Sequence, residues 1–161
     1  MSASSRRRAR EVALQVLYAI DLRDSSARRR AAASQDTPEG DSGPDASGPE
    51  QAFDAVATNF EMPEGARDFA RELVEKVQGH LTELDASISQ YSANWRIERM
   101  AAVDRNILRL GTYELAHTAT PAPVILNEAV DLARRFSHEP SPSFVNGILD
   151  AVAHGVRELE T

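Results

Sequence analysis

The chain has 161 residues, of which 42% are hydrophobic and 27% are charged, a balance typical of a soluble globular domain. It contains no cysteine, which excludes a disulfide framework, a thiolate nucleophile and a cysteine-bound zinc or iron–sulfur site. The formal net charge of −7 argues against a uniformly basic nucleic-acid binder. The charge is uneven, however: residues 1–30 hold eight arginines against three acids, whereas residues 31–64 hold eight acids and no base. This asymmetry favours a localised anion-binding surface, with a merely solvated basic tail as the alternative.

The first predicted element is a helix from Ala9 to Leu22, because apolar residues recur there at helical spacing. A cluster of arginines precedes this helix or lies in its first turn, where the helix dipole disfavours cations. We therefore expect the cluster to meet an external anion; its members are Arg6, Arg7, Arg8 and Arg10. Arginines before an apolar run also suggest a signal or transit peptide, but Glu11 and Asp21 interrupt the pattern. No window reaches the ~18 apolar residues of a membrane span. The lack of cysteine suits a reducing cytoplasm, which is the expected location.

The next segment, residues 23–52, contains no Val, Ile, Leu, Met, Phe, Tyr or Trp. Such a segment buries too little apolar surface to offset the entropy of ordering it. The composition therefore predicts a disordered linker inserted within one domain that spans residues 1–161. Only residues 27–33 are expected to form a transient helix.

The remainder of the chain is predicted to be helical throughout. Apolar residues at helical spacing, prolines and capping residues indicate elements over about 53–60, 63–79, 82–91, 103–115, 123–136 and 141–159. Trp95 lies in a break between two of them, and Gly111 is expected to allow close helix packing. No convincing strand pattern occurs, so the predicted fold class is all-α, a helical bundle of about seven helices.

Motifs of catalysis and metal binding are missing from the sequence. There is no glycine-rich phosphate loop, no serine nucleophile elbow and no HExxH zinc motif. The four histidines are scattered along the chain, at His80, His117, His138 and His154. We therefore expect no enzyme activity, no cofactor and no metal site.

Four strings carry more information than composition does. They are RRRAREVALQVLY at residues 6–18, VDRNILRLGTYEL at 103–115, PVILNEAVDLA at 123–133 and FVNGILD at 144–150. In order and spacing they closely resemble the opening, two central helices and C-terminal signature of the NusB family of transcription antitermination factors. The resemblance covers nearly everything except the predicted linker. It implies two small helical subdomains of three-helix type.

The resemblance also implies a function and partners. NusB proteins pair with NusE, a small-subunit ribosomal protein, and the pair binds the boxA element of ribosomal RNA leader transcripts. Together they help assemble a termination-resistant elongation complex on RNA polymerase. By position, the RNA-facing residues implied are Arg6, Arg7, Arg8, Arg10, Tyr18, Phe136 and Phe144, and the NusE-facing residues are Tyr91 and Asp104.

Several of these residues have a structural alternative. Phe136 sits on an apolar stripe and could instead be a core residue. Tyr18 could be a core residue with its hydroxyl at the surface, and Phe144 could be a buried anchor. Asp104 near a helix start is placed to interact with the helix dipole. Asn127 and Asn146 are placed either to cap turns or to read bases.

The sequence departs from the family pattern in the turn Glu139-Pro140-Ser141-Pro142-Ser143, where relatives often carry an acid and a base, and in its longer linker. Two other functions remain open. One is an accessory domain of an RNA methyltransferase, which is disfavoured because no methyl-donor domain follows before Thr161. The other is a helical protein–protein scaffold without its own RNA contact.

Overall fold

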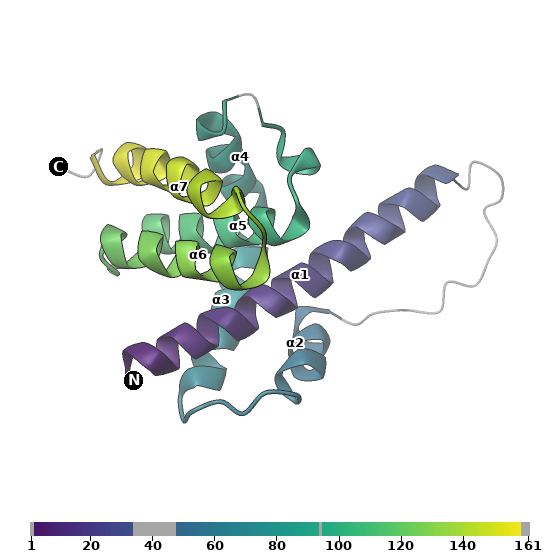
Figure 1. Ribbon diagram of the computed structural model, residues 1–161. Coiled ribbons are helices and arrows are strands. Elements are labelled where there is room, and N and C mark those ends of the chain that lie inside the picture. The colour runs from purple at the N-terminus through teal and green to yellow at the C-terminus, as the bar shows by residue number, and fades with distance from the viewer. Residues whose placement is uncertain (1, 34–47, 94, 159–161) are drawn as a thin grey trace.

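The computed structural model describes residues 2–33, 48–93 and 95–158, which form seven α-helices and one short 3-10 helix (Figure 1). Within these residues there is no β-strand, and the all-α prediction is confirmed. The elements are α1 (Ala3–Ala33), α2 (Pro49–Ala57), α3 (Ala66–Gly79), α4 (Leu81–Tyr91), η1 (Ile97–Arg99), α5 (Ala102–His117), α6 (Ala122–Phe136) and α7 (Ser141–Glu158).

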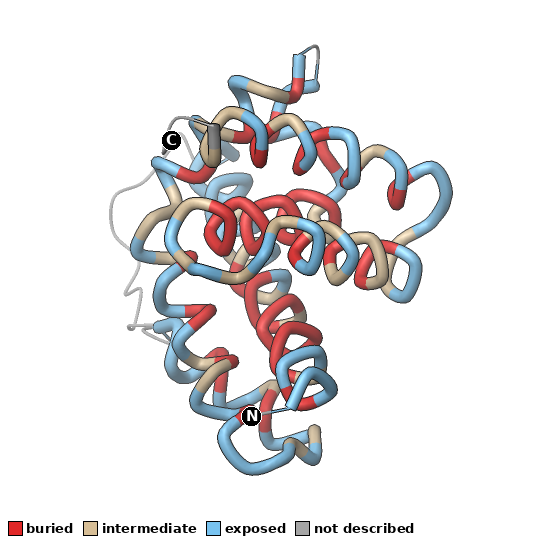
Figure 2. The backbone as a smooth tube through the Cα atoms, turned by 90° about the vertical axis from the view of Figure 1, so that its left-hand side faces the viewer, coloured by how far each residue is buried: buried red, intermediate tan, exposed pale blue. Residues whose placement is uncertain are grey.

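The helices form two groups that meet along α1 and α5. Helices α1, α2 and α3 pack together, while α5 packs against α4, α6 and α7 (Figure 1). Helix α1 also contacts α5, so the two groups share one core. Figure 2 shows the buried positions gathered where helices face each other. The arrangement agrees with the two small helical subdomains that the sequence implies.

Helix α5 lies at the centre of this core, and every residue from Asp104 to Leu115 is buried. Gly111 explains how α7 comes so close: a Cβ atom added there would lie 2.8 Å from Leu149 Cδ1. The close packing expected at Gly111 is therefore observed.

Buried charges on α5 are paired with acids from α1 and α4. Arg105 bonds Asp21 at 2.8 Å, and Arg109 forms two bonds to Asp85, at 2.8 and 2.9 Å. Asn106 also donates to Asp21, at 2.8 Å. Because buried charges are tolerated only when paired, this network fixes the register of α1 and α4 on α5.

Helix α1 is much longer than the predicted span of residues 9–22. It continues through residues 23–33, and α2 begins at Pro49, so both ends of the predicted linker are helical. The segment 23–33 lacks large apolar residues but is rich in alanine and arginine, which favour helix, and has no glycine or proline. The composition of this segment therefore explains why it is exposed, but it does not prevent helix formation as the linker prediction assumed. Residues 34–47 of the predicted linker lie outside the described residues.

None of the described helices combines the length and hydrophobicity needed to cross a membrane.

Candidate nucleic-acid interface

The arginines at the start of α1 point in different directions around the helix. Arg7 and Tyr18 are eleven residues apart, or about three turns, so they lie on one face, with Glu11 between them. Arg6 is exposed, and among the described residues it has no ion pair. The four arginines predicted as one cluster therefore have different environments.

Arg10 belongs to the interior, which corrects its prediction as an RNA contact. Its side chain is only 4% exposed, and it binds the carboxylate of Glu114 on α5 through Nε and Nη2, with a shortest distance of 2.7 Å. Its guanidinium also lies 5.7 Å from the centre of the Phe69 ring. This is a two-pronged buried ion pair that joins α1 to the core.

Arg7 and Arg8 are accessible but already have acidic neighbours. Arg7 donates to both oxygens of Glu128 on α6, at 3.0 and 3.2 Å, and lies 3.5 Å from Asp131. The Glu128 carboxylate raises the pKa of the Arg7 guanidinium, which stays charged. Arg8 bonds Glu11 at 3.0 Å and lies 4.9 Å from the centre of the Phe60 ring. An RNA phosphate would have to compete with these carboxylates or share their arginines.

A second pair of exposed arginines completes the basic part of this surface. Arg135 at the end of α6 bonds the buried carboxylate of Glu11, and its guanidinium lies 5.8 Å from the centre of the Phe136 ring. Arg134, one residue earlier, is 66% exposed and lies 3.4 Å from Asp131. Sequence reasoning missed both, because α6 reaches α1 only in the folded chain.

Tyr18 and Phe136 are brought together on this face. They line an apolar hollow of about 410 Å³ with Leu14, Gln15, Val56 and Val103. Tyr18 is 36% exposed, and Phe136 is half-buried against the core. Both side chains are therefore partly exposed, and neither is purely core.

Phe144 contacts the one tryptophan of the chain. It lies on the first turn of α7, half-buried, with Trp95 edge-on at 5.5 Å between ring centres. Trp95 is 60% exposed, the most exposed of the large hydrophobic side chains in the part of the chain described. The sequence placed Trp95 in a break between helices but assigned it no role.

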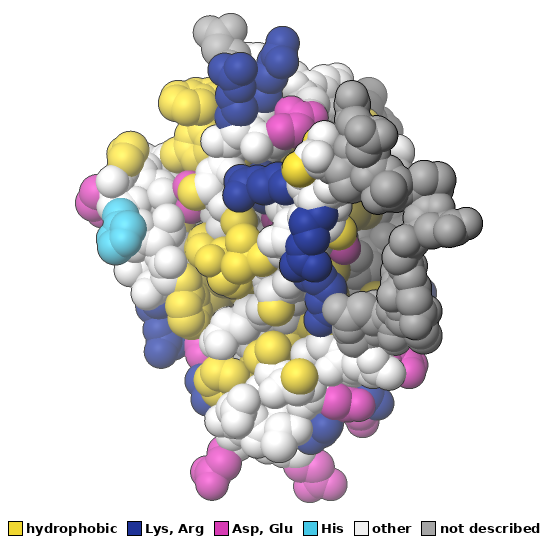
Figure 3. Space-filling view, turned by 90° about the vertical axis from the view of Figure 1, so that its right-hand side faces the viewer, with side chains coloured by type: hydrophobic (Ala, Val, Ile, Leu, Met, Phe, Trp, Pro, Cys, Tyr) yellow, Lys and Arg dark blue, Asp and Glu magenta, His cyan; other side chains and the backbone are white. Residues whose placement is uncertain are grey.

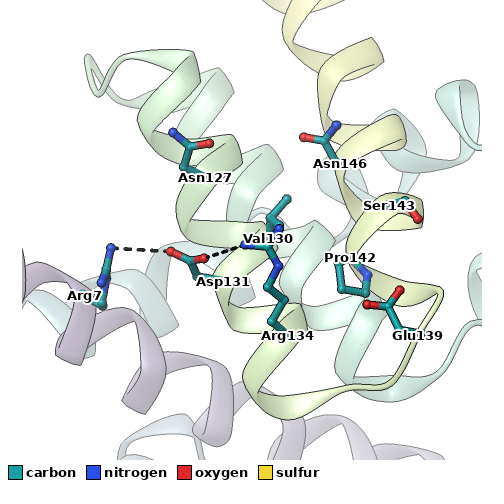
Figure 4. A pocket seen from close by; sticks show the side chains of 9 residues that line it. All are labelled: Arg7, Asn127, Val130, Asp131, Arg134, Glu139, Pro142, Ser143 and Asn146. Carbon is teal, nitrogen blue, oxygen red and sulfur yellow. Dashed lines mark hydrogen bonds and ion pairs between the residues drawn. The ribbon is translucent and has the colours of Figure 1, made fainter.

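A polar groove runs between α6 and the start of α7, next to Arg7 (Figure 4). It measures about 700 Å³. The exposed amides of Asn127 and Asn146 lie across it from one another, and Arg134, Glu139 and Ser143 line the end near the α6–α7 turn. Both asparagines are thus accessible to a ligand rather than engaged in capping.

The remaining arginines of α1 form a separate group at the other end of the helix. Arg23 and Arg28 to Arg30 follow Arg10 by at least thirteen residues, or about 20 Å of helix. Figure 3, viewed from the side toward which this end points, shows a row of basic side chains beside hydrophobic ones. Apart from the buried Arg10, the arginines of α1 therefore lie in two separate regions of the helix rather than in one basic head.

Tyr91 and Asp104, the predicted NusE contacts, are both engaged within the chain. Asp104 is 7% exposed and accepts hydrogen bonds from Ser137 and Ser141, each at 2.9 Å. Tyr91 is half-buried over Gly155 of α7, where an added Cβ would meet its hydroxyl. Asp104 thus holds the α6–α7 turn, a role that neither of its predicted alternatives named, and Tyr91 keeps only part of its ring accessible.

Comparison with known proteins shows to which family the chain belongs. The NusB family model matches residues 7–154, which include all of this surface except Arg6. The chain belongs to the NusB family. It is 44% identical to the transcription antitermination protein NusB of Solibacter usitatus over 156 residues, covering 96% of this chain and 92% of that protein. It is 40% identical to NusB of Myxococcus xanthus over 150 residues, covering 92% and 94%.

Solved NusB structures share the fold. The chain superposes on NusB of T. maritima with a TM-score of 0.73 and 29% identity, covering 97% of each chain. It is equally similar, with a TM-score of 0.73 and 28% identity, to a chain in the crystal structure of antitermination factors NusB and NusE in complex with dsRNA, covering 96% of this chain and 99% of that one. Membership of a family of antitermination factors agrees with the prediction of a non-enzymatic protein.

Proposed function

We propose that this NusB-family protein binds the boxA element of ribosomal RNA leader transcripts together with NusE. In this role it supports antitermination by the RNA polymerase elongation complex, in the cytoplasm. The proposal draws on the relatives' named role in transcription antitermination and on the solved complex of related factors with dsRNA. It also rests on the chemistry of the surface along α1.

The observation that carries the proposal is the pairing of arginines with accessible aromatic rings on a chain of net charge −7. Arg6, Arg7 and Arg8 lie on the α1 turns that precede Tyr18, and Phe136 lies beside Tyr18. Guanidinium groups bind phosphates, and accessible aromatic rings stack on unpaired bases. Single-stranded RNA is recognised by this combination.

Base selection is proposed for the groove between α6 and α7. The Asn127 and Asn146 amides each offer a donor and an acceptor, which suits the edge of an unpaired base. Phe144 and Trp95 are proposed as a second stacking platform at the start of α7. We keep Tyr91 as a NusE contact, and assign Asp104 the supporting role of holding the α6–α7 turn.

The test is a titration of labelled boxA RNA with the full chain, with and without NusE. We expect NusE to strengthen binding, and we expect RNA to change the fluorescence of Trp95, the single tryptophan. Replacing Arg6 and Arg7 with Gln should weaken binding. The matched control replaces Arg67 and Arg71, two partly exposed arginines of α3 that pair with Asp54 instead.

Equal affinities of the two double variants and the unchanged protein would remove the α1 arginines from the interface. If boxA and a scrambled RNA also bound equally weakly in the presence of NusE, the scaffold alternative would replace the proposal.

A further inference from the structure

The fold brings together two histidines that the sequence separates by 37 residues. His80 joins α3 to α4, Glu83 lies in the first turn of α4, and His117 is the last residue of α5. One ligand atom from each of these three side chains lies within 4.8 Å of the others. Among the described residues, no other group of three histidines or acids comes this close.

The contacts within this group orient its ligand atoms. His117 Nε2 lies 2.9 Å from Glu83 Oε1, and the two imidazole rings lie 4.4 Å apart between centres. His80 Nδ1 lies 2.7 Å from the carbonyl oxygen of Lys76. A carbonyl only accepts, so Nδ1 donates, and in the neutral ring the lone pair is left on Nε2. Histidines that bind metals commonly donate their other nitrogen to a carbonyl in this way.

The buried ring of Tyr113 backs the site. It is stacked with His117 at 5.4 Å between ring centres, and it lies 5.8 Å from His80. Since Tyr113 is only 7% exposed, it fixes both imidazoles from the core side and leaves their outer side open to solvent.

We propose that His80, Glu83 and His117 form a binding site for a divalent transition-metal ion, Zn²⁺ in the first instance. Two imidazoles and one carboxylate are a known zinc ligand set, with metal–ligand distances of about 2.0–2.2 Å. A tetrahedral ion at these distances needs ligand atoms about 3.4 Å apart. The His117–Glu83 pair at 2.9 Å would therefore open slightly, and separations of up to 4.8 Å within the group would close by about 1 Å. Water would supply the fourth ligand at this partly exposed position. Imidazole ligands favour Zn²⁺, Ni²⁺ or Cu²⁺ over Mg²⁺ and Ca²⁺.

The site would link the junction of α3 and α4 to the end of α5. His80 and Glu83 belong to the corner between α3 and α4, whereas His117 ends α5. An ion bound by all three would tie this corner to the C-terminal end of the central helix. The ligands are separate from the RNA-binding residues proposed on α1, α6 and α7, so this proposal and the proposed function can fail independently.

The experiment is calorimetric titration of Zn²⁺ into the full chain after dialysis against a chelator, with the melting temperature measured in parallel. We expect one ion per chain, and a melting temperature that rises by several degrees, about 5 °C, at a large excess of Zn²⁺ over the dissociation constant. His117→Gln and His80→Gln should each weaken binding by about 100-fold or more, because loss of an outer-shell partner alone costs 10–100-fold.

The matched control is His138→Gln, an exposed histidine in the α6–α7 turn, which should bind Zn²⁺ as the unchanged protein does. Melting without metal checks that each variant is folded. Binding of Co²⁺ gives a second readout, because four-coordinate Co²⁺ absorbs visible light more strongly than the hydrated ion. No heat of binding at millimolar Zn²⁺, or equal affinity of His117→Gln and the unchanged protein, would overturn the proposal.

Discussion

Neighbouring arginines on α1 have opposite roles because a helix turns each side chain to a different environment. Arg10 is buried in an ion pair with Glu114, whereas Arg7 is half exposed and pairs with Glu128 and Asp131 at the surface. The string RRRAR suggests four equivalent cations, and nothing in it distinguishes these environments. The deciding partner of Arg10 lies 104 residues away, on α5.

Replacing Arg10 with Gln should destabilise the fold. The change leaves the buried carboxylate of Glu114 without its ion partner, and breaking such a pair costs about 3–5 kcal/mol. Arg6→Gln is the matched control, and as a surface change it should shift stability by within about 0.5 kcal/mol. Chemical denaturation of both variants measures the difference. Equal stability of the two would show that the Arg10–Glu114 pair contributes nothing.

Replacing Glu128 with Gln should strengthen RNA binding. Glu128 holds both donating nitrogens of Arg7, so a phosphate must displace it or bind beside its negative charge. Removing that charge frees Arg7 and lowers the local repulsion, and the gain should be greatest at low salt. Affinity for boxA RNA with NusE present is the measurement. The control is Glu75→Gln, on the exposed face of α3, which should leave the affinity unchanged. An affinity of Glu128→Gln equal to or below that of the unchanged protein would contradict this role for Glu128.

At the scale of helices, the order and approximate position of the elements were predictable, because apolar spacing is a local property. The predicted spans near residues 103–115 and 123–136 match α5 and α6 closely. The ends of α1 were not predictable from apolar spacing, since residues 23–33 form helix without a buried face. Likewise the meeting of His80 with His117, and of Phe144 with Trp95, depends on how helices pack.

Gly155 illustrates a requirement that arises only from packing. Its lack of a side chain lets α7 approach Tyr91 of α4, where an added Cβ would lie 2.5 Å from Tyr91 Cζ. Gly155→Ala should therefore displace the tyrosine ring and destabilise the protein by about 1–3 kcal/mol, the usual cost of overpacking. Gly147→Ala is the control, because an added Cβ there meets nothing within 4 Å. Thermal unfolding of both variants is the measurement, and a Gly155→Ala variant as stable as Gly147→Ala would contradict this packing.

At the scale of the whole molecule, a chain with net charge −7 presents the exposed arginines of α1 in two areas, one at each end of that helix. Only the first area lies beside Tyr18, Phe136 and the groove between α6 and α7. Several of its arginines are already paired with acids, so part of each phosphate contact replaces an existing ion pair. The electrostatic part of RNA binding should therefore be smaller than four free arginines would give.

The assignment of RNA binding to the start of α1 is tested most directly by a variant with Arg6, Arg7 and Arg8 all replaced by Gln. The measurement is the salt dependence of its boxA RNA binding in the presence of NusE. Each phosphate neutralised on a single strand adds about −0.7 to the slope of log affinity against log salt, so two or three contacts predict a slope flatter by between about 1 and 2. Arg10 is kept, so folding should be preserved. A variant that binds boxA RNA with unchanged affinity and unchanged slope would contradict the assignment of RNA binding to this surface.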